Sequence, residues 1–151
     1  MPFPDNSFEV VWTEHVQMNI AGKRVFYDEI RRVLKPGGRL AFHDIFSGPR
    51  QGMTFPVPWA SDASISHLVG LEELKSILGD LHFQPLHWLD KTDASIAFFN
   101  EVLPNVDQNG WTPLSLHLLV SEDPTPKFAN VLLNLEGDHL RVVEAVFTKP
   151  L

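Results

Sequence analysis

Two stretches decide the fold: Phe8-Glu9-Val10-Val11-Trp12-Thr13 and, further along the chain, Arg31-Arg32-Val33-Leu34-Lys35-Pro36-Gly37-Gly38-Arg39-Leu40. The first is short, aromatic and β-branched, which is typical of a strand. The second closes a helical segment, because Pro36 cannot continue a helix and Gly37 accepts a left-handed backbone. An apolar run over 40–46 follows and predicts a second strand. The order strand, helix, strand predicts an α/β fold.

The helix between these strands is predicted from apolar residues at helical spacing. They form one stripe made of Phe26, Ile30, Val33 and Leu34. The charged residues of the same segment fall outside that stripe, so we expect them to face solvent: Lys23, Arg24, Asp28, Arg31 and Lys35.

The rest of the chain continues with short elements. A helix over 71–78 precedes a strand over 83–89, in which Pro85 marks a strand start or an edge strand. Three helical pieces follow: one over 93–103, one from Thr112 to Ser121 and one from Asp123 to just before Gly137. A last strand covers 140–147. The segment 47–66 is too long and too aromatic for an ordinary connection, which favours a lid or a binding loop.

Composition excludes several classes of protein. The 151 residues carry a net charge of −7 and no run of Lys or Arg, which disfavours a nucleic-acid partner. A hydrophobic content of 44% is that of a globular domain, and we expect one domain over 1–151. No apolar stretch approaches the length of a membrane span. The chain has no cysteine, which excludes disulfides and thiolate metal sites and fits a cytoplasmic protein.

Four segments resemble the class I S-adenosylmethionine-dependent methyltransferases of the methyltransferase type 11 kind. They are the Pro2-Phe3 turn, the strand over 8–11, the helix end over 29–34 and the Lys-Pro-Gly-Gly-x-Leu segment over 35–40. The loop around Pro56 to Ala60 and the late helices resemble the sarcosine and dimethylglycine N-methyltransferase branch of that family. The resemblance implies a Rossmann-like sheet, S-adenosylmethionine as the cofactor and a small molecule as the methyl acceptor.

The glycine-rich turn that holds the cofactor in this family has no counterpart in the sequence. The nine glycines are scattered, and none forms such a turn between a strand and a helix. By resemblance, the predicted strands are equivalent to the fourth to seventh of the family sheet. We therefore expect a partial methyltransferase sheet that lacks the first three strands, namely a carboxyl-terminal half that is inactive alone and whose own binding of cofactor is doubtful.

Ligands of open α/β sheets bind beyond the carboxyl ends of the parallel strands, which directs attention to residues 12–15 and 43–44. The resemblance implies cofactor contacts from Trp12 and Thr13. Glu14 or His15 would act as the base that keeps an amine acceptor neutral, or would hold an acceptor hydroxyl or ammonium. Acceptor contacts would come from Met18, Asp44 and Trp59.

Each of these residues also has a structural interpretation. His15 could cap the following helix, Asp44 could cap a helix or loop, and Trp59 could plug the core. His43, on a buried strand, fits a hydrogen-bonded core residue better than a catalyst. The seven histidines show no His-x-x-x-His or His-x-His spacing, so the sequence predicts no metal centre.

Two functions remain open at this point. In the first, the chain is the acceptor-side portion of a small-molecule methyltransferase. In the second, it is a stand-alone, non-catalytic module that associates with itself. If the first three strands are absent, the strand over 8–13 lies at a sheet edge with its backbone groups unpaired. Because a two-fold axis lets one patch bury its own copy, we expect a homodimer through this strand.

Overall fold

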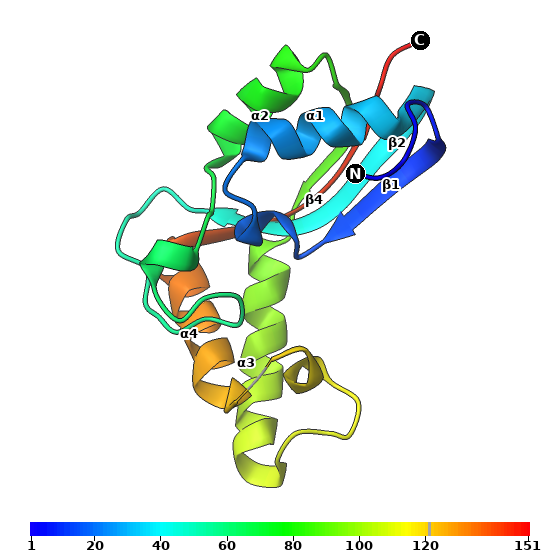
Figure 1. Ribbon diagram of the computed structural model, residues 1–151. Helices are drawn as coiled ribbons and strands as arrows, with labels where there is room; N and C mark the ends of the chain where they lie inside the picture. Colours follow the sequence, from blue (N-terminus) through cyan, green and yellow to red (C-terminus); the bar gives the residue numbers. More distant parts are fainter. Residues whose placement is uncertain (121) are drawn as a thin grey trace.

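The computed structural model describes residues 1–120 and 122–151 and is an α/β fold with a mixed sheet (Figure 1). Within the described residues the sheet has four strands in the order β1-β2-β4-β3. β1 runs parallel to β2, whereas β4 is antiparallel to both of its neighbours. The elements, with η for 3₁₀ turns, are β1 (Phe8–Glu14), η1 (Gln17–Asn19), α1 (Lys23–Val33), β2 (Leu34–Ser47), η2 (Ala63–Ile65), α2 (Leu71–Asp80), β3 (Gln84–Asp90), α3 (Thr92–Asn109), η3 (Leu116–Leu119), α4 (Pro124–Glu136) and β4 (Leu140–Thr148).

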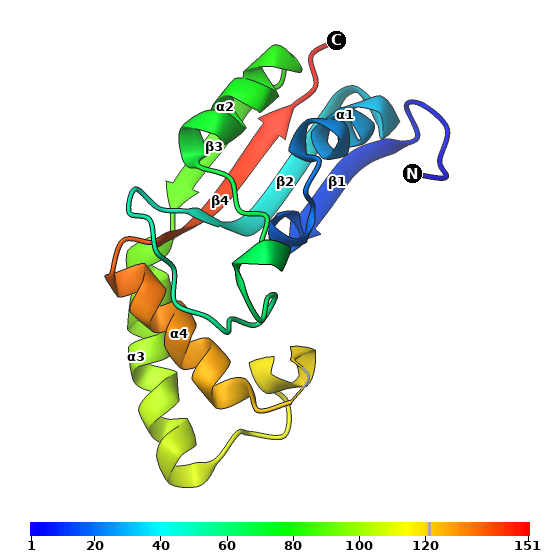
Figure 2. The ribbon, with the colours of Figure 1, turned by 60° about the vertical axis from the view of Figure 1, so that its left-hand side comes forward.

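One face of the sheet packs against α1 and α2 (Figure 2). Alternate residues of β2 and β4 point to this face, because successive side chains of a strand project to opposite sides. Phe42 and Phe46 from β2 meet Ile30 of α1 and Leu74 of α2, and all four are buried. This first core fixes β1 and β2 side by side, with their carboxyl ends at the same end of the sheet.

A second core lies beyond the carboxyl ends of β1 and β2, where α3 and α4 pack against each other and project from the sheet (Figure 1). Phe99 and Leu103 of α3 face Phe128 and Val131 of α4. The segment over 47–66 closes over this core through two hydrogen bonds between Thr54 and the buried Asn134 amide. All the predicted strand and helix segments are present except the helix that begins at Thr112.

The helix expected from Thr112 to Ser121 is wrong. The described part of this segment forms only a single 3₁₀ turn, η3, and Ser121 lies outside the described residues. The physical reason is the lack of a packing partner: Leu114 is 87% exposed and Leu119 is 79% exposed. Since most helix stability in proteins comes from burying an apolar stripe, a capping signal alone does not produce a helix here.

The prediction that Lys23 faces solvent is also wrong. Its side chain is buried, and its ammonium donates hydrogen bonds to the backbone carbonyls of Gln17, Ile20 and His67. These carbonyls come from η1, the turn before α1 and a distant loop. Lys23 therefore fastens the segment after β1 to the rest of the domain, a role that requires the folded chain.

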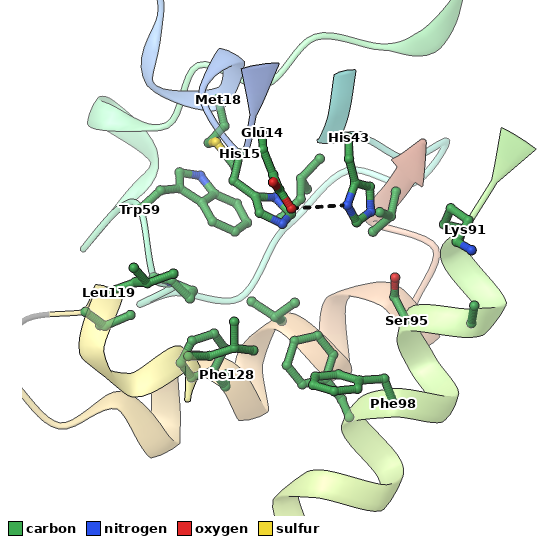
Figure 3. A pocket seen from close by; sticks show the side chains of 18 of the residues that line it. Glu14, His15, Met18, His43, Trp59, Lys91, Ser95, Phe98, Leu119 and Phe128 are labelled. Atoms are coloured by element: carbon green, nitrogen blue, oxygen red, sulfur yellow. Dashed lines mark ion pairs between the residues drawn. The ribbon is translucent and has the colours of Figure 1, made fainter. Parts of the chain in front are cut away.

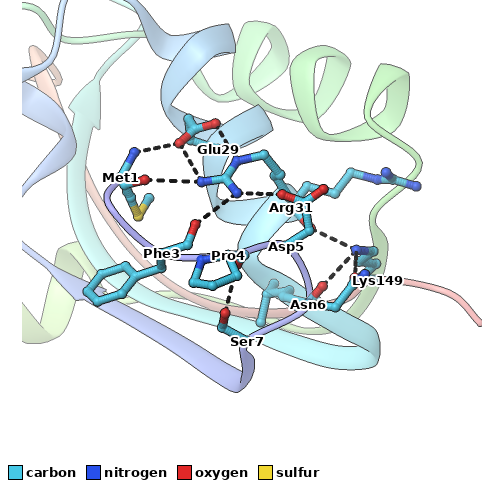
Figure 4. Close-up of polar contacts among 11 residues, drawn as sticks. Met1, Phe3, Pro4, Asp5, Asn6, Ser7, Glu29, Arg31 and Lys149 are labelled. Carbon is cyan, nitrogen blue, oxygen red and sulfur yellow. Dashed lines mark hydrogen bonds and ion pairs between the residues drawn. The ribbon is translucent and has the colours of Figure 1, made fainter.

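The strand at the outer edge, β1, is held by polar contacts at its amino end (Figure 4). Arg32 of α1 donates to Asp5 at 2.6 Å, and Lys149 donates to Asn6 at 2.9 Å. The face of β1 away from α1 is open, and Trp12 on it is 70% exposed. Among the described residues, no helix combines the length and apolarity needed to cross a bilayer.

Candidate active site

A pocket of about 1040 Å³ lies at the carboxyl ends of β1 and β2, between the sheet edge and the α3–α4 pair (Figure 3). Parallel pairing sets Glu14, the last residue of β1, opposite His43 of β2. Beyond them the chain turns through His15, whose backbone N–H donates to the carbonyl of His43 at 3.0 Å. The sheet thus delivers these polar side chains to one end of the pocket.

Glu14, His15 and His43 form this polar end. The Glu14 Oε1 atom lies 3.8 Å from His43 Nδ1, and the two imidazole rings are 5.1 Å apart between centroids. Desolvation by the surrounding residues lowers the pKa of His15, the neighbouring His43 lowers it further, and Glu14 opposes both effects. His15 is therefore held toward its neutral form, in which one ring nitrogen can accept a proton.

The rest of the pocket is mostly apolar. Lys91 and Ser95, from the start of α3, are the polar exceptions on the wall opposite the loop, and Asn19 lies beside Met18. Trp59 covers the loop side (Figure 3), with its indole N–H donating to Ser66 at 3.0 Å. The apolar lining consists of Met18, Ile45, Pro58, Trp59, Ala94, Phe98, Phe99, Leu116, Leu119, Val120, Phe128, Val131 and Val142.

Asp44 does not line this pocket. It is 1% exposed, and its carboxylate accepts backbone hydrogen bonds from Val16, Gln17 and Ile45 at 3.1–3.3 Å. Burial raises the pKa of Asp44, while the three backbone donors hold it down. The contacts are those of the loop cap that the sequence offered as the alternative, and they shape the turn that carries His15.

The structure brings together four of the seven residues named from the sequence: Glu14, His15, Met18 and Trp59 all line the pocket. Trp12 instead lies on the open face of β1 and Thr13 is half-buried behind it, so neither lines the pocket. His15 does not cap the following turn, since the residue at the cap of η1 is Val16 and no side chain bonds there.

Sequence reasoning missed the contributions of His43, Lys91 and α3. A place on a buried strand favours a hydrogen-bonded core role for His43, yet among the described residues its Nε2 atom has no hydrogen-bond partner, and its ring lines the pocket. A usable signal existed for Lys91: it follows β3, whose carboxyl end lies at the same sheet edge as those of β1 and β2. Phe98 and Phe128 carried no signal, because their approach depends on how α3 meets α4.

The described residues of this site do not include the glycine-rich turn that would bind a nucleotide-like cofactor. Gly37, which adopts a left-handed backbone, lies inside β2 and not in a turn between a strand and a helix. Within the described residues, no glycine-rich turn follows a strand, so close approach of backbone N–H groups to a phosphate or ribose is not built in. What the chain does provide is a group of one carboxylate and two imidazoles beside an apolar chamber.

Comparison with known proteins adds independent information. A family model described as a methyltransferase domain matches residues 1–42. The glycine/sarcosine/dimethylglycine N-methyltransferase of Actinopolyspora halophila is 31% identical over 86 residues, which cover 57% of this chain and 12% of that protein. The matches span 10–14% of the length of three curated relatives.

Solved structures extend the likeness over the whole chain. A putative sarcosine dimethylglycine methyltransferase from Galdieria sulphuraria superposes with a TM-score of 0.74 at 18% identity, covering 99% of this chain and 56% of that one. Phosphoethanolamine N-methyltransferase 2 from Haemonchus contortus, solved with S-adenosylmethionine, gives 0.73 at 19% identity, covering 99% of this chain and 35% of that one. This chain thus has the class I methyltransferase fold and, over residues 1–42, the sequence pattern of the methyltransferase-domain family.

Proposed function

We propose that this chain forms the acceptor-side part of an S-adenosylmethionine-dependent methyltransferase that acts on a small molecule, and that it works in the cytoplasm. The observation that carries the proposal is the pocket at the carboxyl ends of β1 and β2, which combines Glu14, His15 and His43 with an apolar chamber. In open α/β sheets this edge is where ligands bind. The match of residues 1–42 to the methyltransferase-domain family supports the choice of reaction.

The chemistry asked of these residues is modest. The cofactor supplies a methyl group on a sulfonium, and transfer is an in-line displacement that needs alignment and exclusion of water more than covalent help. Glu14 or His15 accepts the proton that the acceptor releases. His15 suits this role because its lowered pKa leaves the ring neutral. Trp12 and Thr13, on the strand that leads to this edge, would contact the cofactor, and Met18 and Trp59 the acceptor.

The acceptor we propose is an apolar molecule with one nucleophilic nitrogen or oxygen. A chamber of about 1040 Å³ is large for an amino acid of the size of glycine or sarcosine. Phe98, Phe99 and Phe128 line its wall, and Lys91 is the sole cation among the described lining residues. An apolar body suits such a surface, because burying a charged group against apolar side chains is costly unless the charge is paired. The nucleophilic atom would face Glu14 and His15, with the apolar body toward α3 and α4.

The donor side needs a glycine-rich turn that this sequence does not contain, so we propose that methyl transfer requires a polypeptide segment bearing that turn. Calorimetric titration with S-adenosylmethionine tests this directly. We expect no saturable binding by the chain alone, and methylation of apolar amines or phenols once the segment is supplied. Micromolar binding by the chain alone would remove the need for that segment. A complete lack of methylation with it present would refute the proposed reaction.

We further propose that the chain forms a homodimer through β1. As the outer strand among the described residues, β1 exposes Trp12 and Val10 on its open face, and an open strand edge favours pairing with a second copy. Light scattering at micromolar concentration should give twice the mass of the chain. Trp12→Lys should give the monomer mass, whereas Val25→Lys, equally exposed but on α1, should leave the dimer intact. A monomeric wild-type chain would contradict this association.

A further inference from the structure

The polar end of the pocket brings together three side chains that can ligate a metal. Glu14, His15 and His43 each offer one donor atom, and these atoms all lie within 4.8 Å of one another. Sequence spacing could not reveal this group, because His43 is placed beside Glu14 by the parallel pairing of β1 and β2. Figure 3 shows the carboxylate of Glu14 and both rings converging above the apolar chamber.

The hydrogen-bonding state of His43 is incomplete. Its Nδ1 atom faces Glu14, but the 3.8 Å between them exceeds a hydrogen bond, and among the described residues the buried Nε2 atom on the other side of the ring has no partner either. Buried polar atoms in native proteins are nearly always satisfied, and an exception calls for a missing ligand, ion or water. The ring nitrogen of His43 that could bind an ion beside Glu14 is Nδ1, which no hydrogen bond to that carboxylate occupies.

The backbone at His15 provides a separate observation. This residue has φ of 49°, in the left-handed region that few residues other than glycine adopt. Strained conformations of this kind persist where a side chain must be aimed. Here the turn directs the imidazole of His15 back over His43, with ring centroids 5.1 Å apart. The cap formed by Asp44 holds the following residues, Val16 and Gln17, in place.

We propose that Glu14, His15 and His43 bind a divalent first-row transition metal ion such as Zn²⁺. Two imidazoles and one carboxylate are the ligand set of catalytic zinc and non-haem iron sites, which keep positions open for other ligands. Zinc bonds of about 2.0–2.1 Å place ligand atoms about 3.3 Å apart, so the present group must contract slightly. The side chain of Glu14 is exposed and can adjust, and the open positions would face the pocket.

Two imidazole nitrogens make Mg²⁺ and Ca²⁺ unsuitable, since these ions take oxygen ligands. The proposal stands apart from methyl transfer, because it concerns affinity for an ion alone. With the ion bound, Glu14 and His15 would hold it instead of accepting a proton directly. An acceptor oxygen in the pocket could then occupy an open coordination position.

Titration of tag-free, metal-stripped protein with ZnCl₂ in a calorimeter tests the site, with Co²⁺ absorption spectra as a second readout. We expect one ion per chain and no binding of Mg²⁺. Glu14→Gln, His43→Gln and His15→Asn should each weaken binding at least about tenfold. Asparagine suits position 15 because it tolerates the left-handed backbone, so the turn is retained.

The matched control is His87→Gln. His87 forms a comparable pair with Glu144, with its Nε2 3.4 Å from the carboxylate, but no third ligand joins that pair among the described residues. This variant should bind Zn²⁺ as the wild type does. Wild-type affinity in the Glu14 and His43 variants, or an equal loss in His87→Gln, would overturn the proposed site whether or not the chain methylates any substrate.

Discussion

Replacing Asp44 with alanine should reveal how much of the stability rests on one buried carboxylate. Asp44 accepts hydrogen bonds from the backbone amides of Val16, Gln17 and Ile45. Gln17 and Ile45 are buried, so their N–H groups would be left without partners, whereas the exposed Val16 can turn to water. Hydrogen bonds to a charged group contribute about 1.5–3 kcal/mol each, which gives about 3–6 kcal/mol for the two buried donors.

Part of this loss is offset, because removing the carboxylate also removes the cost of burying it. That cost is visible in the raised pKa of Asp44. We therefore expect Asp44→Ala to lower the free energy of unfolding by about 2–4 kcal/mol. Urea denaturation followed by tryptophan fluorescence measures the change through the midpoint and slope of the transition.

The control is Asp62→Ala. Asp62 makes a similar set of contacts, accepting hydrogen bonds from Ser64 and Ser61, but it is exposed and solvent can replace them. Its loss should cost clearly less than that of Asp44. If the two variants lose equal stability, or if Asp44→Ala loses less than about 1 kcal/mol, burial of the accepting carboxylate is not what holds the turn after β1.

Three further predictions concern stability. Gly48→Ala would put a Cβ 2.1 Å from a backbone oxygen and should sharply lower the melting temperature, whereas Gly79→Ala, in open space on α2, should add about 0.5–1 kcal/mol. The hydrogen bond from Arg32 lowers the pKa of Glu29 to about 2. The stability that Glu29 adds is therefore complete above its ordinary pKa of 4.5 and is lost as the pH falls toward 2. The difference in melting temperature between the wild type and Glu29→Gln should disappear over that range. Asp123→Ala removes the cap that accepts from the second residue of α4 and should cost about 1 kcal/mol in urea denaturation.

Local patterns were enough to predict most of the elements. Pro36 and Gly37 indicate a helix end, and α1 does end shortly before them at Val33, but its cap is the extended Leu34, and Gly37 has its left-handed φ of 77° inside β2. Asp123 caps α4 as its sequence indicates. Pro85 lies near the start of β3, which is an edge strand. These features depend on neighbours in sequence, where propensity and backbone sterics decide.

Non-local contacts explain what the sequence did not reveal. His43 meets Glu14 only through the register of two strands, and the three carbonyls around Lys23 come together only in the folded chain. Thr112 and Pro113 carry the signal of a helix start, but most of the leucines that follow stay exposed, namely Leu114, Leu118 and Leu119. The candidate site was therefore located at the right sheet edge, while its far wall on α3 and α4 was not foreseen.

The two cores have a consequence for how this chain can change over time. β2 sends Phe42 and Phe46 into the core under α1 and α2, and Ile45 into the one that borders the pocket. Substitutions among the aromatic residues of α3 and α4 alter the chamber and the second core, but they leave the first core between the sheet, α1 and α2 unchanged. Ligand preference can consequently diversify among descendants of this chain while the scaffold that presents Glu14 and His15 keeps its shape.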